Sequence, residues 1–150
     1  PMRRTTGVLS VLLLLLCAAA GLSAQDIGGD PQSGQVNGFQ LDQNYPNPFN
    51  PETRIPFTLA EGLFVEGRPA VVSIRIFNIL TQLVASPVAL RHPSGQGVAV
   101  DQLEYTQPGR YEAYWDGNDQ MGRQVSSGIY LMQLSVNGLK PITRKMYVMK

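Results

Sequence analysis

The residues best suited to metal chemistry lie within residues 116–122. Asp116, Asn118 and Asp119 bring three side-chain oxygen donors into four consecutive positions, and Ca²⁺ prefers oxygen ligands of this kind. A calcium loop of the EF-hand type also requires a bidentate glutamate at a fixed spacing, which this segment lacks. Its two glycines instead favour tight turns, in which Asp and Asn side chains accept hydrogen bonds from backbone N–H groups. We therefore predict a turn and no metal, and keep these three residues as a weak calcium candidate.

Catalytic chemistry has little support in the sequence. The chain contains one histidine, His92, and one cysteine, Cys17. His92 lies in an expected exposed turn, which suits poorly the base of a Ser-His-Asp triad. A zinc site would need more histidine or cysteine ligands than these two residues supply, and the acidic residues form no motif of paired carboxylates. We predict that the protein is not an enzyme and that it binds no cofactor and no small-molecule substrate.

The charge balance argues against nucleic acid as a partner. The chain has 12 Lys and Arg residues against 11 Asp and Glu residues. Two of the basic residues, Arg3 and Arg4, fall in a segment that we expect to be removed, so the remaining chain has a net charge near −1. No predicted strand carries a stripe of basic side chains, and nucleic-acid binding depends on such a patch.

The first part of the chain is typical of a secreted protein. Arg3 and Arg4 precede an apolar run at residues 7–16 and a stretch of small residues ending at Ala24, which predicts a signal peptide at residues 1–24. Residues 25–40 are rich in Gly, Ser, Gln and Asp, which predicts a flexible linker. Residues 41–150 are long enough for one domain with a modest core.

The domain at residues 41–150 has the pattern of an all-β fold. Val72, Ile74 and Ile76 alternate with polar residues, and other segments repeat this period of two. Asn137-Gly138 predicts a hairpin, and Gly or Pro interrupts the chain about every ten residues. These features predict an immunoglobulin-like antiparallel β-sandwich of about seven strands.

Residues 41–51, which we call the entry segment, contain three prolines and three asparagines. Each X-Pro step disfavours the helical conformation for the preceding residue, and Asn side chains readily bond to the nearby backbone. We therefore predict a rigid, extended entry into the domain, and neither a helix nor a central strand.

Residues 41–150 resemble the C-terminal sorting domain of type IX secretion cargo proteins, a family related to the immunoglobulin-like domain of the flagellar hook-capping protein. Several segments carry the resemblance in the order in which the family has them. These segments are residues 41–51, 72–80, 109–111, 115–117, 127–130 and 145–150. One departure is Thr81, which occupies a turn position where the family typically has glycine, so we expect a strained or altered turn there.

The resemblance implies an export signal. After the inner membrane is crossed, such a domain is recognised in the periplasm by the type IX machinery, which includes an outer-membrane translocon and a sorting protease. It directs a passenger to the outside or to the outer-membrane surface of a Gram-negative bacterium. The residues that the resemblance marks as sorting determinants are Tyr45, Pro46, Asn47, Pro48, Phe49, Gly109, Tyr111, Gly128, Tyr130, Lys145 and Lys150.

Two questions stay open at the level of sequence. The marked glycines and aromatic residues either form the signal or recur because they build the fold. The chain is either a sorting domain or a stand-alone secreted binding or structural module, such as an adhesin or a cap. For a sorting domain, we expect the lysine-ending C-terminal strand to present an open edge that a receptor extends by β-augmentation.

Overall fold

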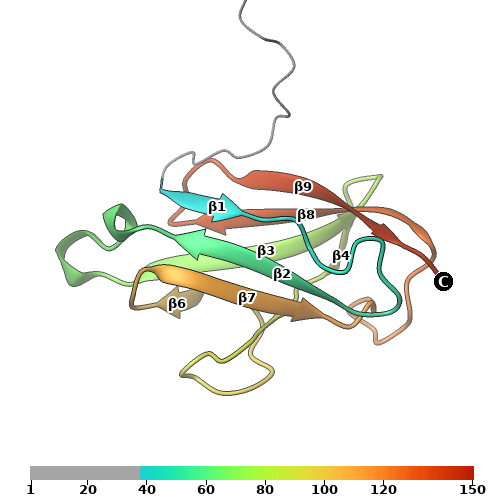
Figure 1. Ribbon diagram of the computed structural model, residues 1–150, viewed down its shortest axis with the longest axis horizontal. Helices are drawn as coiled ribbons and strands as arrows, with labels where there is room; N and C mark the ends of the chain where they lie inside the picture. The colour runs from blue at the N-terminus through green and yellow to red at the C-terminus, as the bar shows by residue number, and fades with distance from the viewer. Residues whose placement is uncertain (1–37) are drawn as a thin grey trace, which may run out of the picture. The chain divides into compact units, whose positions relative to one another are not determined.

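The computed structural model describes residues 38–150, which form two antiparallel β-sheets around one hydrophobic core (Figure 1). The first sheet has the order β1 (Phe39–Leu41), β2 (Thr53–Leu59), β7 (Gly109–Trp115) and β5 (Val88–Ala89). The second has the order β4 (Leu83–Ala85), β3 (Ala70–Asn78), β8 (Gly128–Val136) and β9 (Ile142–Val148), and β6 (Leu103–Tyr105) also pairs with β3. Two 3-10 helices, η1 (Glu61–Leu63) and η2 (Val65–Gly67), lie between β2 and β3.

The predicted all-β antiparallel sandwich is confirmed. The described residues form nine strands instead of the expected seven. Four of the nine strands are only two or three residues long, and strands this short show no alternation that a sequence pattern could reveal.

The core comes from every second residue of the long strands. Val72, Ile74 and Ile76 on β3 are fully buried, as are Met132 and Leu134 on β8. Successive side chains of a strand point to opposite faces, so one face of each sheet can be buried against the other sheet. Burial of each such side chain contributes about 1.5–3 kcal/mol, which makes the alternation the main determinant of the fold.

The predicted hairpin at Asn137-Gly138 connects β8 to β9. Both residues have positive φ, 51° at Asn137 and 69° at Gly138, as a tight hairpin turn requires. The Asn137 Oδ1 atom also accepts a hydrogen bond from the Val71 N–H at 2.8 Å. The turn residue therefore ties the hairpin to β3 as well.

The described chain begins just before β1, which pairs with β2. Phe39 is 1% exposed and lies opposite Leu59, so the packed structure starts two residues before the expected domain boundary at residue 41. The predicted signal peptide at residues 1–24, and the linker up to residue 37, lie outside the described residues. In residues 38–150, no helix is long and apolar enough to cross a membrane.

In the turn after β3, the backbone of Thr81 has a left-handed conformation. Thr81 has a φ of 61°, a conformation that is strongly unfavourable for a β-branched side chain. The Asn78 Oδ1 atom closes the turn by accepting hydrogen bonds from the N–H groups of Leu80 and Gln82, both at 3.0 Å. The structure thus agrees with the expected strain at this position.

Candidate functional site

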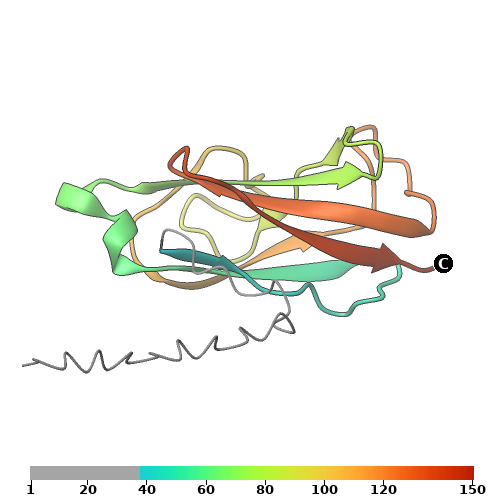
Figure 2. The ribbon, with the colours of Figure 1, turned by 90° about the horizontal axis from the view of Figure 1, so that it is seen from above.

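The entry segment lies beside the end of β9 near the C-terminus (Figures 1 and 2). The Phe49 N–H donates to the Tyr147 carbonyl at 3.0 Å, and the Met149 N–H donates to the Phe49 carbonyl at 2.9 Å. The Tyr147 N–H donates to Asn47 Oδ1 at 3.0 Å. We call these three hydrogen bonds the entry–β9 pairing. Two groups of predicted sorting determinants, far apart in the sequence, are therefore neighbours in the structure.

The backbone edge of β9 is already occupied in its last third. Both the N–H and the carbonyl of Tyr147 bond to the entry segment, and the Lys145 carbonyl accepts a hydrogen bond from Gln43 Nε2 at 2.9 Å. The expectation of an open edge is wrong at Tyr147, because both of its outward backbone groups already have partners, and the Lys145 carbonyl has one as well. A receptor that added a strand here would have to displace the entry segment.

Buried polar side chains hold the entry segment in a bent path. Asn44 is 2% exposed, and its Nδ2 atom donates to Thr53 Oγ1 at 3.0 Å. Thr53 Oγ1 in turn donates to the Pro46 carbonyl at 3.0 Å. The chain bends at residues 46–48 and 50–51, so the predicted extended path is wrong. Asn and Thr side chains close the bends by bonding to the nearby backbone.

Phe49 fixes the entry segment to the core. It is 2% exposed and packs edge-on against Trp115, with ring centroids 5.5 Å apart. Trp115 packs in the same manner against Tyr130 at 5.8 Å. Such edge-to-face aromatic pairs are favourable beyond their buried area. Phe49 and Tyr130 therefore contribute to the fold through buried contacts.

The turn after β7 fits closely against the end of the entry segment. Gly117 has a φ of 78°, and a Cβ atom at this position would lie 2.2 Å from the carbonyl oxygen of Pro51. Only glycine combines this backbone conformation with so close an approach. Gly117 thus explains one of the matching segments, residues 115–117, by packing alone.

Tyr45 is the exposed aromatic residue of the entry segment. It is 44% exposed, and its hydroxyl donates a hydrogen bond to the Glu112 carboxylate. Glu112 also forms an ion pair with Arg54 at 3.3 Å. The hydrogen bond from Tyr45 lowers the pKa of Glu112, and the same bond raises the pKa of Tyr45. Pro46 and Pro48 are exposed as well, and Asn47 is half-buried, so a partner can reach this part of the segment.

Two of the marked Gly-x-Tyr pairs form the same local structure at the starts of β7 and β8. The Tyr111 hydroxyl donates to the Gln107 carbonyl at 2.5 Å, and the Tyr130 hydroxyl donates to the Ser126 carbonyl at 2.9 Å. In both cases the acceptor lies four residues before the tyrosine. This bond resembles the tyrosine corner of β-sandwich domains.

The glycines of these two corners share one backbone conformation. Gly109 has a φ of 148° and Gly128 a φ of 152°. Burial raises the pKa of both Tyr111 and Tyr130. The repeated spacing was visible in the sequence, and its structural role accounts for four of the marked residues.

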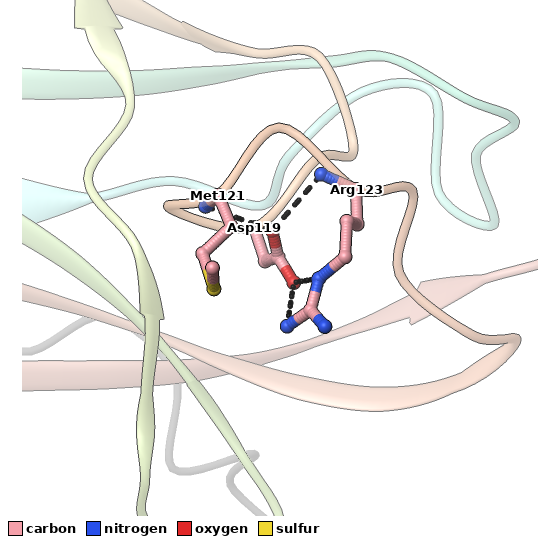
Figure 3. A network of polar contacts seen from close by, with 3 residues as sticks. All are labelled: Asp119, Met121 and Arg123. Carbon is pink, nitrogen blue, oxygen red and sulfur yellow. Dashed lines mark hydrogen bonds and ion pairs between the residues drawn. The ribbon is translucent and has the colours of Figure 1, made fainter.

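Within the calcium candidate, the Asp119 carboxylate caps a turn (Figure 3). Asp119 Oδ1 accepts hydrogen bonds from the N–H groups of Met121 at 2.9 Å and Arg123 at 3.0 Å, and Oδ2 accepts from Arg123 Nε at 3.0 Å. The bond from the Arg123 N–H is the main cause that lowers the pKa of Asp119. Asp116 Oδ1 accepts from the Asn118 N–H at 2.9 Å. In the part of the chain that the structure describes, no three His, Cys, Asp or Glu residues gather as a metal site.

His92 takes part in loop structure through both ring nitrogens. Its Nε2 atom lies 2.8 Å from the Glu104 carbonyl oxygen, and its Nδ1 atom accepts from the Ser94 N–H at 3.1 Å. The ring packs edge-on against Tyr105 with centroids 4.9 Å apart. The carbonyl contact requires the proton on Nε2, which leaves Nδ1 as the acceptor.

The last two marked residues, Lys145 and Lys150, are exposed. The Lys150 N–H donates to Ser127 Oγ at 3.1 Å, which connects the chain end to the turn before β8. The side chain of Lys145 lies on the outer face of the second sheet, next to Leu131 in the strand register. The part of this outer face around Leu131 is apolar, although solvated strands usually alternate apolar and polar residues. The prediction from the sequence did not include this feature. The uninterrupted apolar run at residues 129–132 could have indicated it.

The described residues thus define an all-β antiparallel sandwich whose entry segment is bonded to its C-terminal strand. No family model matches the chain, and no curated protein matches it. Among solved structures, the chain is similar to dimeric latent PorU from Porphyromonas gingivalis, with a TM-score of 0.49 and 19% identity over 76% of this chain and 10% of that one.

A second similar structure is PorZ from the same organism, described as an essential bacterial surface component of the type IX secretion system. The TM-score is 0.42, with 17% identity over 81% of this chain and 13% of that one. The chain therefore spans only about a tenth of the length of either protein. Likenesses of this size carry no argument about this chain.

Proposed function

We propose that this domain is a non-catalytic export domain, recognised by type IX secretion machinery and used to move a passenger across the outer membrane. The observation that supports the proposal is the entry–β9 pairing. It joins the two segments that the family resemblance marks as determinants, residues 45–49 and 145–150, into one surface. On this proposal the domain passes through the periplasm, binds the outer-membrane translocon and is a substrate of the sorting protease.

The pairing suggests how recognition would depend on folding. The exposed residues of the entry segment and the end of β9 come together only in the folded domain, because they lie about one hundred residues apart. A receptor that contacts both segments therefore binds the folded form and ignores the unfolded chain.

The non-catalytic part of the proposal is supported by the polar groups themselves. The carboxylate of Asp119 is used by Met121 and Arg123, and both nitrogens of His92 are used by loop backbone. Groups that are committed to turn and loop structure are poorly placed to transfer protons to a substrate.

The test is a fusion of a signal peptide, a fluorescent passenger and residues 25–150, expressed in a host with an active type IX system and in the same host lacking the translocon. We expect fluorescence at the surface or in the medium of the first host and in the periplasm of the second. An identical distribution in both hosts would contradict the proposal.

A stand-alone secreted binding or structural module is the second candidate. It is favoured by the structural roles of Phe49, Gly117 and Tyr130, because residues that build the fold would recur in any sandwich of this type. For such a module, deleting the translocon would leave the location of the fusion unchanged.

A further inference from the structure

One end of the outer face of the second sheet carries apolar side chains where solvent-facing strands usually carry polar ones. Its other end is polar, with Arg75 opposite Gln133 and Ser73 opposite Ser135. At the apolar end, neighbouring positions in the strand register hold apolar residues on β4, β3, β8 and β9. These residues, which we call the apolar outer face, are Phe77, Leu83, Ile129, Leu131 and Tyr147. Antiparallel sheets with one solvated face normally alternate apolar and polar residues.

The apolar outer face is accessible. Leu83 is 44% exposed, Ile129 is 41% exposed and Tyr147 is 42% exposed. Phe77 and Leu131 are half-buried between them. Within residues 38–150, the other sheet covers only the opposite, inner face. Contiguous exposed apolar groups on an ordered surface are typical of interaction sites.

The first sheet shows that this apolar character is not a requirement of the fold. Its outer face is polar and internally paired: Arg54 forms an ion pair with Glu112 at 3.3 Å, and Arg110 forms one with Asp42 at 3.7 Å. Two sheets of similar size in one sandwich therefore differ in the chemistry of their outer faces, because Leu83 and Ile129 are exposed aliphatic residues on the second sheet where the first carries ion pairs.

The balance of charged residues also differs between residues 124–150 and residues 38–123. Residues 124–150, which include β8 and β9, contain four basic residues and no Asp or Glu. Residues 38–123 contain nine acidic and six basic residues. Lys145 stands directly beside Leu131 on the apolar outer face, so a positive charge lies at the β9 margin of the face.

From these observations we infer that the apolar outer face binds a partner protein whose own surface is apolar and bordered by carboxylates. Complementary charge orients such a partner and excludes wrong ones. This inference assigns a surface to the recognition step and therefore rests on the proposed export function.

Two other occupants fit the surface less well. A second copy of this chain that used the same face would bring its own Lys145 toward the first, and like charges at an interface are unfavourable. A lipid surface would require apolar side chains that reach beneath the headgroups, whereas Ile129 and Leu83 each expose less than half of their surface.

The first experiment tests the apolar contacts in the fusion described above. The double variant Leu83→Thr with Ile129→Thr places β-branched threonine, which is suited to strands, at both positions and removes apolar area. We expect export to fall at least about tenfold, equivalent to about 1.4 kcal/mol of binding. The matched control, Gln40→Thr with Arg110→Thr at neighbouring positions on the outer face of the first sheet, should retain export. Thermal unfolding of both purified variants checks that each is folded.

The second experiment tests the charge without touching the apolar packing. Lys145 is exposed, so we expect Lys145→Glu and Lys145→Arg to fold like the wild-type chain. Export should fall severalfold with Lys145→Glu and remain with Lys145→Arg. If the double variant proves unfolded, this pair decides the matter, and equal export of the two lysine variants would overturn the inference.

The outcomes separate this inference from the proposed function. Failure of the wild-type fusion to depend on the translocon contradicts the export proposal itself. Translocon-dependent export that is undiminished in the folded double variant overturns only the inference. Sedimentation of the purified chain as a dimer that Ile129→Thr disrupts would assign the face to a second copy. Binding to vesicles of anionic phospholipid that the double variant abolishes would assign it to a membrane.

Discussion

At the scale of single residues, Phe49 is the most informative position. The resemblance marks it as a sorting determinant, yet its side chain is 2% exposed and packs against Trp115. A partner therefore cannot reach the ring in the folded domain. Its effect on any recognition event must pass through the position of the entry segment.

We expect Phe49→Ala to lower the free energy of unfolding by about 3–5 kcal/mol, because it leaves a cavity beside Trp115. Denaturant unfolding followed by tryptophan fluorescence measures the loss. Tyr45→Ala is the control in the same segment. Tyr45 is 44% exposed, so its truncation should cost less than about 1 kcal/mol. Equal losses for the two variants would contradict the anchoring role of Phe49.

Thr81 offers a test of backbone strain. Its φ of 61° is a conformation that costs a non-glycine residue about 1–3 kcal/mol. We expect Thr81→Gly to raise the free energy of unfolding by about 1 kcal/mol, a net gain after the extra chain entropy of glycine. Thr143→Gly on β9 should do the opposite, since glycine weakens a strand interior. Denaturant midpoints that move in the same direction for both variants would refute the strain.

Tyr105 carries a buried hydroxyl that has no hydrogen-bond partner within the described residues. Tyr105→Phe keeps the ring and removes the unsatisfied group, so we expect a stabilisation of about 1 kcal/mol or more. Tyr147→Phe, at an exposed position, should change stability by less than about 0.5 kcal/mol. A destabilised Tyr105→Phe variant would show that the hydroxyl has a partner after all.

The same residue predicts a dependence on alkaline pH. Burial raises the pKa of Tyr105 to about 12 in the folded protein from a usual value of 10.0. Above the usual value the unfolded chain releases this proton while the folded chain keeps it, so stability falls as pH rises from 10 to 12. Denaturant unfolding across this range should show a shallower fall for Tyr105→Phe than for the wild-type chain. The pKa values of Tyr45 and Tyr114 are also raised. Part of the fall in stability with pH therefore remains in both the wild-type chain and Tyr105→Phe.

At the scale of elements, the entry–β9 pairing shows what sequence patterns reveal and what they do not. The alternation of Val72, Ile74 and Ile76 predicted a strand and its buried face, because both follow from a local period of two. The bond between Phe49 and Tyr147 depends on where two distant segments meet, and no local pattern encodes that. The bend of the entry segment was missed for the same reason, since Thr53 supports it from the next strand.

The candidate site divides in a similar way. The sequence identified the residues of the entry segment and of β9, and it placed a turn at residues 116–122. It did not distinguish exposed residues such as Tyr45 from buried ones such as Phe49, because burial depends on the packing of both sheets. The apolar outer face escaped notice because Ile129 and Leu131 belong to the first half of β8, which is apolar on both faces.

The side chain of Asn47 offers a test of the pairing between these elements. Asn47→Ala removes the acceptor for the Tyr147 N–H, an amide on the outward edge of β9. A hydrogen bond worth about 1 kcal/mol corresponds to about a fivefold faster exchange of this amide with solvent, measured by hydrogen exchange and NMR. Asn50→Ala, at an exposed position, should leave the rate unchanged. Unaltered exchange at Tyr147 in Asn47→Ala would contradict the pairing.

At the scale of the whole molecule, β9 belongs to the core as much as to any signal. Met146 is fully buried and Val148 is 5% exposed, and β9 pairs with β8 along seven residues. Burial of each of these side chains contributes about 1.5–3 kcal/mol, against a typical total of about 5–15 kcal/mol for a domain.

We expect removal of residues 146–150 to abolish the cooperative unfolding transition, and removal of Lys150 alone to preserve it. Calorimetry of the two shortened chains makes the comparison. A cooperative transition in the chain lacking residues 146–150 would show that β9 is dispensable for folding. If the expectation holds, loss of export after a longer truncation reports loss of the fold, and only point variants can identify a signal.

The entry–β9 pairing also sets an order of events during biosynthesis. Residue 49 leaves the ribosome about one hundred residues before residue 149. The hydrogen-bond partners of its backbone N–H and carbonyl, Tyr147 and Met149, are synthesised only later. Until those partners emerge, the entry–β9 pairing cannot form. Completion of the sandwich is thereby delayed until residue 149 has been made.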